Sequence, residues 1–465
     1  MTLPFIEKAA DFLVEARHEQ IGADAIAAAK EAFIDYIAVA LGGVGEPVSK
    51  NILGWATERS WGSSCAVIGR VDRLDPENAA LCNAVSGHAL DFDDTSWSTI
   101  GHPTTVVAPA AIATGEMVRA SGREVLSAYL VGVEVSHRLA DISMPFVSEN
   151  GWHTTGVYYA IGAAAAASFL LRLDRRTTIN ALGLSISRSS GVRSNFGTQA
   201  KPYHAGMAAR AGLEAVSLAR AGLTASASAV EGVDGFLDCF AGDRSAYFER
   251  MDQMIFGKPF DLVSRGLAYK KYPCCSGSHP ACDVMIELVN EHSLKPEDIV
   301  SIRVGASLLA ERELVCHNPA TPQQARFSME FALAVAVSKG SLGLDSFRTE
   351  VLEDPEIRGL MGRVRLELDD ELAKLGFIGT APVKIDITLR NGQVLRAARD
   401  LAIGNPERPF TDDDRRSKFM MCASRLLDQP AAEEVYRELQ AFDTWADIHE
   451  GISAINRWLP LTSGV

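Results

Sequence analysis

The stretch Val383-Lys-Ile-Asp-Ile-Thr-Leu-Arg-Asn391-Gly392-Gln-Val-Leu-Arg-Ala-Ala398 decides how this chain is divided. Apolar and polar residues alternate on both sides of Asn-Gly, which is the strongest short signal for a β-hairpin. Residues 299–306 and 364–368 alternate in the same way, and helical patterns cover 280–292 and 324–339. This part of the chain therefore predicts a small α+β domain.

Helical patterns dominate the chain before residue 265. Residues 21–41 and 124–139 repeat apolar side chains at intervals of three and four, which is typical of amphipathic helices. Residues 156–171 and 205–221 are rich in alanine and glycine. Because small side chains let helices approach closely, we expect a tightly packed helical core.

Helical periodicity returns at the end of the chain, from about Thr411 to Leu459, after a Thr-Asp-Asp-Asp run suited to a helix cap. A C-terminal segment that rejoins the first helical region would make the α+β part an insertion. With 465 residues, two or three domains are expected.

The overall composition excludes several classes of function. Hydrophobic residues make up 47% and charged residues 22%, as in ordinary soluble proteins, and the net charge of −14 argues against a nucleic-acid partner. The first residues lack a secretory signal, and the alanine-rich run is too short and small-sided to span a bilayer. We therefore expect a cytoplasmic protein without a membrane partner. No G-x-G-x-x-G follows a predicted strand, so no nucleotide cofactor is indicated.

The eight cysteines favour reduced thiols rather than a metal centre. Cys274, Cys275 and Cys282 lack a CxxC partner, so we expect them to be free and no zinc to bind. The run Asp91-Phe-Asp93-Asp94 leaves magnesium open as an alternative, because carboxylate oxygens are its usual ligands.

Ionisable residues are concentrated in His88-Ala-Leu-Asp91-Phe-Asp93-Asp94-Thr95. Asp91 and Thr95 are four residues apart and are expected on one side of a helix end, with His88 one turn earlier. His102 follows in a loop that can return its imidazole toward Asp91, and a carboxylate beside an imidazole forms a general acid/base pair. Taken alone, the segment favours a capping aspartate with a structural histidine.

Similar clusters recur at the starts of other predicted helices. His153 precedes the alanine-rich helix, Lys201 and His204 begin the next one, and Lys270 lies shortly before His279 at a further helical pattern. Helix N-termini attract anions such as carboxylates. Half of the ten histidines lie in such segments, which favours a functional set over scattered structural histidines.

Five short stretches resemble the signatures of the MmgE/PrpD family. They are HALDFDDT, GHPTT, GWHTTG, GTQAKPYHAG and KKYPCC with a later histidine. Family members include 2-methylcitrate dehydratases, cis-aconitate decarboxylases and an iminodisuccinate epimerase. The resemblance covers nearly the whole chain and implies a mainly α fold, with a large all-helical domain and an inserted smaller α+β lid domain. Its expected parts are residues 1–266, 267–402 and 403–465.

The resemblance also places functional residues. Positions that form the family's active site correspond here to Asp91, Thr95, His102, Lys201 and Lys270, and the further histidines near that site to His153 and His279. Two positions depart from the family pattern: Thr154 stands where proline is usual, and Cys275 stands where some decarboxylases have histidine.

These residue types predict a mechanism as well as a site. Asp91 and His102 are expected to transfer protons, while Lys201 and Lys270 bind and polarise carboxylates. Thr95, His153, His204 and His279 are expected to bind substrate. Asp91, His102, Lys201 and Lys270 are expected to meet in one pocket between the domains.

The expected function is that of a lyase that needs no metal or organic cofactor. It would dehydrate or decarboxylate a di- or tricarboxylic acid of the 2-methylcitrate or cis-aconitate type. An isomerase or epimerase acting at a carboxylate-bearing carbon, and a non-enzymatic helical scaffold, remain as alternatives. A homodimer is expected mainly from the resemblance.

Overall fold

The computed structural model describes residues 3–459. Within it the chain forms two compact units. Among the described residues, unit 1 consists of 3–192, 202–267 and 413–459, and unit 2 of Arg193–Lys201 and Ala268–Asp412. The short segment Arg193–Lys201 thus clusters with the later part of the chain rather than with its neighbours in sequence.

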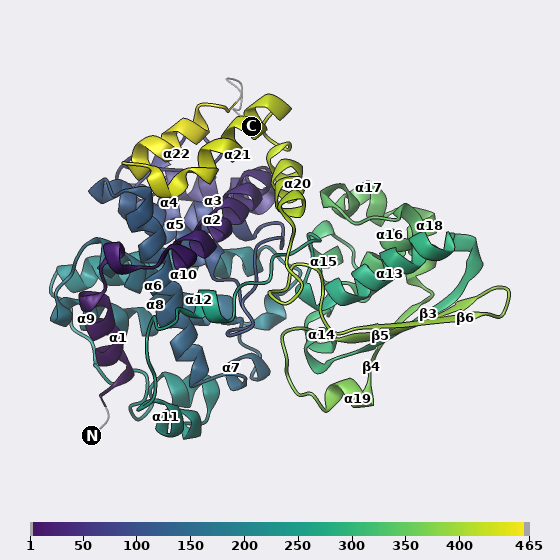
Figure 1. Cartoon of the computed structure of the whole chain (residues 1–465), viewed down its shortest axis with the longest axis horizontal. Coiled ribbons are helices and arrows are strands. Elements are labelled where there is room, and N and C mark those ends of the chain that lie inside the picture. Colours follow the sequence, from purple (N-terminus) through teal and green to yellow (C-terminus); the bar gives the residue numbers. More distant parts are fainter. Residues whose placement is uncertain (1–2, 460–465) are drawn as a thin grey trace. The chain divides into compact units, whose positions relative to one another are not determined.

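Unit 1 is built from helices and one very small sheet, a two-stranded antiparallel pair (Figure 1). The pair joins β1 (Cys65–Ala66) to β2 (Arg73–Leu74). The helices of the main part are α1 (Phe5–Glu15), α2 (Ala23–Gly43), α3 (Pro47–Thr57), α4 (Pro76–His88), α5 (Thr104–Val118), α6 (Gly122–Asp141), α7 (Phe146–Glu149), α8 (Thr154–Leu170), α9 (Arg175–Ile186), α10 (Ala200–Arg220), α11 (Ser245–Arg250) and α12 (Asp261–Ser264).

The core of unit 1 lies where α6, α5 and α8 pack together, and α8 is buried along almost its whole length. Glycines allow the close approach: a Cβ on Gly162 would lie 2.3 Å from Ser136 Oγ, and one on Gly132 would lie 2.5 Å from the carbonyl oxygen of Gly162. Such distances exclude any larger residue without movement of a helix. The tight helical core predicted from the small residues is confirmed.

The C-terminal helices belong to unit 1 (Figure 1). They are α20 (Asp412–Ala423), α21 (Gln429–Gln440) and α22 (Ile448–Asn456). The Ile448 amide donates to the Ala120 carbonyl at 2.8 Å, and the Gly122 amide donates to the Trp445 carbonyl at 2.8 Å. The chain therefore leaves the helical unit for unit 2 and returns to it, which confirms a mainly α fold with an inserted α+β part.

Unit 2 contains a four-stranded sheet in the order β4-β3-β5-β6. The strands are β3 (Ile299–Ala306), β4 (Val364–Leu368), β5 (Val383–Leu389) and β6 (Val394–Arg399). Strand β3 runs parallel to β4 and antiparallel to β5, and β5 pairs antiparallel with β6 across the Asn-Gly turn. Burial alternates along β5, as its sequence pattern requires, and the predicted hairpin is confirmed.

Helices α13 and α16 pack on this sheet, α13 against β5 and β6 and α16 against β4 (Figure 1). The helices of unit 2 are α13 (His279–His292), α14 (Leu308–Glu313), α15 (Pro322–Ala325), α16 (Met329–Lys339), α17 (Thr349–Leu352), α18 (Pro355–Met361) and α19 (Asp370–Ala373).

The single helix predicted over 324–339 is wrong, because the structure divides it into α15 and α16. Ser328 is extended and its hydroxyl accepts a hydrogen bond from the Phe331 amide at 3.1 Å, which caps α16. Serine competes for backbone groups in this way and so favours a helix start over a helix interior. The break turns Phe327 toward Phe196, whose ring centroid lies 5.3 Å away.

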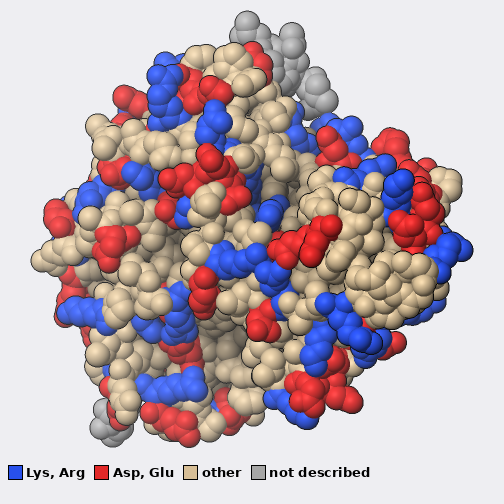
Figure 2. Space-filling view, turned by 45° about the vertical axis from the view of Figure 1, so that its right-hand side comes forward, with Lys and Arg blue, Asp and Glu red and all other residues tan. Residues whose placement is uncertain are grey.

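The molecular surface carries charges of both signs. Figure 2 shows Lys and Arg side chains interleaved with Asp and Glu over the face in view, as the excess of acids and the many bases would give. Within residues 3–459 no helix combines the length and apolarity needed to cross a bilayer.

Candidate functional site

The acidic motif of unit 1 lies in a buried loop after α4. The helix ends at His88, the Asp91 amide donates to the His88 carbonyl at 3.2 Å, and Asp91 takes a left-handed φ of 50°. The helical spacing expected between Asp91 and Thr95 is therefore replaced by a turn. At most 3% of each ionisable residue in this motif is exposed, although a buried charge is costly unless it is paired.

Imidazoles and carboxylates meet within this loop. His88 Nδ1 lies 2.9 Å from Asp93 Oδ2, and His102 Nδ1 lies 3.6 Å from the same oxygen. His102 Nδ1 also donates to the Asp94 carbonyl at 2.7 Å, which fixes the ring. Single ligand atoms of His88, Asp91 and Asp93 all lie within 4.8 Å of one another. The arrangement can hold a proton on an imidazole and pass it to or from a bound molecule.

Two further histidines adjoin this cluster. His153 is the N-cap residue of α8, and the ring centroids of His88 and His153 are 5.8 Å apart. His153 Nδ1 lies 3.0 Å from His204 Nδ1, so one of these nitrogens must donate and the other accept. The Gly191 carbonyl accepts from the His153 amide at 3.0 Å, and a Cβ on Gly191 would lie 3.2 Å from the His204 ring. The backbone of residue 191 therefore positions both imidazoles.

The back of the loop is held by buried polar groups that the sequence pattern did not single out. Lys418 of α20 donates from Nζ to the Phe92 carbonyl at 2.8 Å and lies 2.7 Å from Asp35 Oδ1. Burial raises the pKa of the Asp94 carboxyl to about 8, against the lowering effect of a hydrogen bond from Thr104. Asp94 is thus mostly protonated at neutral pH and supports the loop without adding a further charge.

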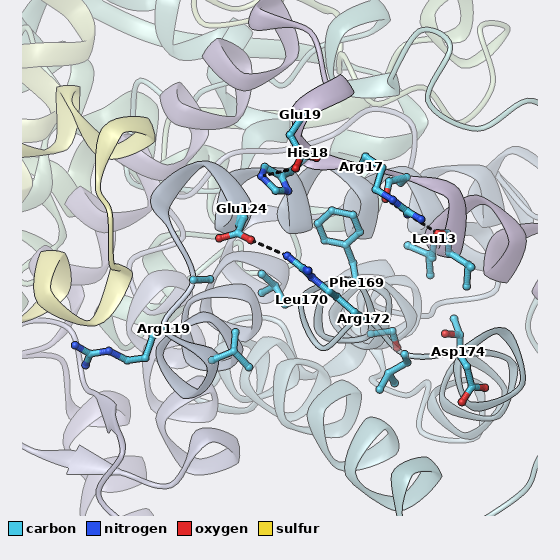
Figure 3. A pocket seen from close by; sticks show the side chains of 17 residues that line it. Leu13, Arg17, His18, Glu19, Arg119, Glu124, Phe169, Leu170, Arg172 and Asp174 are labelled. Atoms are coloured by element: carbon cyan, nitrogen blue, oxygen red, sulfur yellow. Dashed lines mark hydrogen bonds and ion pairs between the residues drawn. The ribbon is translucent and has the colours of Figure 1, made fainter.

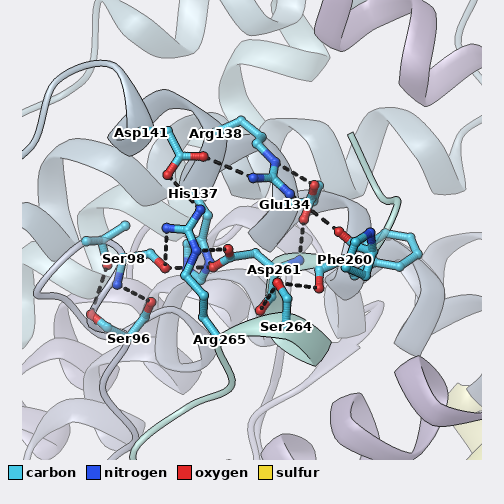
Figure 4. Close-up of polar contacts among 12 residues, drawn as sticks. Ser96, Ser98, Glu134, His137, Arg138, Asp141, Phe260, Asp261, Ser264 and Arg265 are labelled. Carbon is cyan, nitrogen blue, oxygen red and sulfur yellow. Dashed lines mark hydrogen bonds and ion pairs between the residues drawn. The ribbon is translucent and has the colours of Figure 1, made fainter. Parts of the chain in front are cut away.

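A second network ties the far end of this loop to α6 and α12 (Figure 4). His137 Nδ1 lies 2.6 Å from Asp261 Oδ2, and the Ser98 hydroxyl donates to the same oxygen at 2.7 Å. His137 Nε2 lies 3.2 Å from the Tyr159 hydroxyl, which is 2.6 Å from Thr99 Oγ1. Burial opposes ionisation of Asp261, but hydrogen bonds and charge from His137 outweigh it and hold the pKa of that carboxyl below its usual range.

No pattern in the sequence indicates this second network. His137 lies within a long helix and Asp261 begins a short one, and 124 residues separate them. No local spacing connects such positions, so only the packing of the helices brings them together.

Unit 2 holds the predicted cations. Lys201 and Lys270 are 4% and 2% exposed, and Lys201 Nζ lies 5.1 Å from the ring centroids of both Phe196 and Phe327. His279 is also buried, with Nε2 3.2 Å from the Cys274 carbonyl and its ring 5.2 Å from that of Tyr272. The contacts of His279 are thus those of a residue that shapes the KKYPCC segment.

The cysteines of the chain are all free thiols. Cys275 Sγ donates to Glu313 Oε2 at 3.4 Å, and the Cys275 amide donates to the Arg326 carbonyl at 2.9 Å. Cys274 and Cys282 are buried nearby and share a hydrogen bond that favours the thiolate on Cys274 and raises the pKa of Cys282.

The predicted residues are therefore divided between the two units. Asp91, Thr95, His102, His153 and His204 lie in unit 1, where the histidines gather around His88. The others, Lys201, Lys270 and His279, lie in unit 2. Lys201 and His204 are three residues apart in the first turn of α10. The start of this one helix therefore carries a predicted residue of unit 2 and a predicted residue of unit 1.

Two groups of side chains in the described residues could hold a metal ion, and both include His88. One is His88 with Asp91 and Asp93, and the other is His88 with His102 and His153, each with ligand atoms within 4.8 Å. Three imidazoles suit zinc, and an imidazole with carboxylates suits several divalent ions. The first group differs from the predicted cluster of Asp91, Asp93 and Asp94. Asp94 is not part of this group, and its side chain accepts a hydrogen bond from Thr104.

A large cavity of unit 1 lies apart from these residues (Figure 3). Its volume is about 840 Å³, and it is lined by parts of α1, α6, α8 and α9 with the loops between them. Figure 3 shows Arg172 reaching toward Glu124, and the two side chains are 3.4 Å apart. None of the predicted site residues lines this cavity.

Comparisons with known proteins identify what this chain resembles over most of its length. The model of the MmgE/PrpD N-terminal domain matches residues 7–249, and that of the C-terminal domain matches residues 272–443. A cis-aconitate decarboxylase of Mus musculus is 28% identical over 90% of this chain and 86% of its own length. The human cis-aconitate decarboxylase is 28% identical over 83% and 80%, and that of Aspergillus terreus is 25% identical over 94% and 93%.

Proposed function

Because this chain belongs to the MmgE/PrpD family, we propose that it is a lyase that removes carbon dioxide or water from a small di- or tricarboxylic acid, without a metal or organic cofactor. One observation carries the proposal: the buried cluster of His88, His102 and His153 with Asp91 and Asp93. The similarity to three cis-aconitate decarboxylases favours decarboxylation of a cis-aconitate-like acid.

The proposed chemistry divides between two sets of side chains. Lys201 and Lys270 bind carboxylates, because a buried ammonium group is stabilised by an anion and in turn stabilises charge on its oxygens. In decarboxylation the bond between a carboxyl carbon and its neighbour breaks, carbon dioxide leaves, and the electron pair stays on carbon. His102, held by the Asp94 carbonyl and beside Asp93, then supplies the proton that forms the new C–H bond.

Asp91 is proposed as the second proton-transfer group, and Thr95, His153, His204 and His279 as substrate-binding or supporting residues. In dehydration the same groups would remove a proton next to a carboxylate and protonate the leaving hydroxyl. The two reactions share the carbanion-like step, so the fold by itself does not select between them.

Epimerisation at a carboxylate-bearing carbon is a second candidate, which a specific contact favours. The imidazoles of His153 and His204 share a proton at 3.0 Å, so they form a second proton-transfer pair beside that of His102 and Asp93. An epimerase needs proton transfer on two faces of a carbon and no leaving group.

The experiment that separates these reactions uses the full chain in deuterated water with cis-aconitate and, separately, 2-methylcitrate. Release of carbon dioxide with one deuterium in the product supports decarboxylation, and loss or addition of water supports dehydration. Deuterium at a stereocentre of an otherwise unchanged acid, tested with a chiral dicarboxylate, would support the epimerase instead. No reaction with any of these acids would contradict the proposed chemistry.

A pair of matched variants tests the role of the cluster. His102→Gln keeps the size and polarity of the side chain but removes its proton transfer, so turnover should fall roughly 10²- to 10⁴-fold. His292→Gln makes the same change at the exposed end of α13 and should leave turnover unchanged. Equal activity of the two variants would contradict the role of His102.

We also propose that the protein is a homodimer, as the family resemblance implies. Sedimentation velocity over a concentration series should show a species of twice the 50.0 kDa chain mass. A stable monomer throughout the series would contradict the dimer.

A further inference from the structure

Arg193 follows directly after the segment that positions two of the clustered histidines. The Gly191 carbonyl accepts from the His153 amide, and the Gly191 backbone lies against the His204 ring. Val192 forms an isolated bridge with Trp152, and the chain then enters a short 3-10 turn over Arg193–Asn195. The chain just before this turn is thus anchored beside His153 and His204.

The guanidinium of Arg193 has one buried nitrogen without a hydrogen-bond partner among the described residues. Its Nη1 atom is buried, and within residues 3–459 no side chain or carbonyl accepts a hydrogen bond from it. The guanidinium lies 5.6 Å from the ring centroid of Phe377, which shields one face of it. A guanidinium stays charged in proteins, so leaving the buried Nη1 donor of this half-buried side chain unpaired is costly.

The neighbouring charges act on this group in opposite directions. Burial has the largest effect and lowers the pKa of Arg193, Glu313 raises it and Arg312 lowers it. Glu313 accepts a hydrogen bond from Cys275 Sγ at 3.4 Å and forms no hydrogen bond with Arg193. Arg193 is therefore a shielded cation at the KKYPCC segment, with donors available for an anion.

Arg193 also lies in the same short segment as Lys201, and both cluster with unit 2. Each cation faces aromatic rings, Lys201 those of Phe196 and Phe327 and Arg193 that of Phe377. The two groups differ in what they recognise. An ammonium acts as a point charge, whereas the planar guanidinium matches both oxygens of a carboxylate with two parallel hydrogen bonds.

We propose that Arg193 is a carboxylate-binding residue that makes the protein selective for acids with an additional carboxylate beyond those bound by Lys201 and Lys270. The ligand class is a tricarboxylate, bound through one carboxylate in the two-point geometry that arginine favours. The identification of that tricarboxylate as the substrate rests on the proposed lyase function, whereas the binding itself does not.

The test measures binding of propane-1,2,3-tricarboxylate, a non-reacting probe, by calorimetry. Arg193→Gln should weaken binding roughly tenfold or more, because a charge-assisted hydrogen-bonded contact is lost. Arg193→Lys keeps the charge but loses the planar pair of N–H donors, so its affinity for the probe should lie between those of wild type and Arg193→Gln. Arg348→Gln removes an exposed arginine that pairs only with Asp345 at the surface of unit 2, so it should bind as wild type does.

Stability without ligand separates binding from a structural role. If Arg193 serves a ligand, Arg193→Gln should be as stable as wild type or more so, and should lose the stabilisation that the tricarboxylate gives wild type. If Arg193 serves the fold, the variant should be less stable while the ligand still stabilises it. That second result would overturn the proposal, as would equal affinity of wild type and Arg193→Gln or no binding by wild type.

The turnover assay keeps this inference distinct from the proposed function. With an acid that reacts, Arg193→Gln should raise KM more than it lowers kcat, since the contact forms in the ground state. Wild type that binds the tricarboxylate through Arg193 but converts none of the acids would refute the lyase and leave the binding site intact. Turnover by wild type with unchanged KM in Arg193→Gln would refute the binding site alone.

Discussion

Asp94 allows the strongest quantitative prediction, because its carboxyl is buried beside other acids. It is 1% exposed, accepts from the Thr104 hydroxyl, and has Asp35 and Asp93 among its charged neighbours. Burial raises its pKa from 3.8 to about 8. Between these two values the native state keeps a proton that the unfolded state has released. The contribution of Asp94 to stability must therefore fall as pH rises through this window.

The size of the effect follows from linkage. One pKa unit corresponds to about 1.4 kcal/mol, so this carboxyl alone should cost roughly 2 to 3 kcal/mol of stability between pH 5 and pH 7. Asp94→Asn resembles the protonated acid in shape and polarity but does not titrate. The free energy of unfolding of the variant should therefore rise relative to wild type by about that amount over the same interval.

Urea unfolding at pH 5, 6 and 7 and constant ionic strength measures the difference. Asp24→Asn is a matched control, since it removes an exposed carboxyl in the first turn of α2 and should follow the pH dependence of wild type. A difference between Asp94→Asn and wild type that stays constant from pH 5 to pH 7 would show that Asp94 is ionised in the native protein. The electrostatic description of the loop would then be wrong.

Three further outcomes are expected. Lys418→Met should destabilise the protein by about 3 kcal/mol at pH 8, because Asp35 loses its buried partner. Adding Asp35→Asn to this variant should restore part of the lost stability. If urea unfolding shows that the losses of the two substitutions simply add, the pairing is contradicted. Lys201→Met should weaken tricarboxylate binding, measured by calorimetry, and slow turnover, measured by kinetics, together. An effect on turnover alone would argue against carboxylate binding by Lys201. His137→Gln should reduce the hydrogen-exchange protection of residues 96–101, since Ser98 and Thr99 lose the support of the network. The hydrogen-exchange protection of α16 should stay unchanged. Unchanged protection of residues 96–101 would show that the loop is held by other contacts.

Local patterns were sufficient for most of the elements, and the family resemblance supplied the inserted topology. The hairpin follows from alternation around Asn391-Gly392, because strand periodicity and turn chemistry act over a few residues. Family membership likewise follows from short motifs whose spacing is written in the chain. The one helix placed wrongly, at 324–339, failed where Ser328 competes for a backbone amide, which helical periodicity alone does not reveal.

The sequence by itself thus determined the mainly α architecture, the inserted sheet and which histidines, aspartates and lysines to examine. Only the tertiary structure decided their partners. Within the loop His88 meets Asp93, but His153 meets His204 from 51 residues away and His137 meets Asp261 from 124 residues away. It also decided that burial raises the pKa of Asp94 to about 8 and that Nη1 of Arg193 is buried without a hydrogen-bond partner. The reason is physical: burial and long-range contacts set protonation and pairing, and both depend on how distant helices pack rather than on neighbours in the chain.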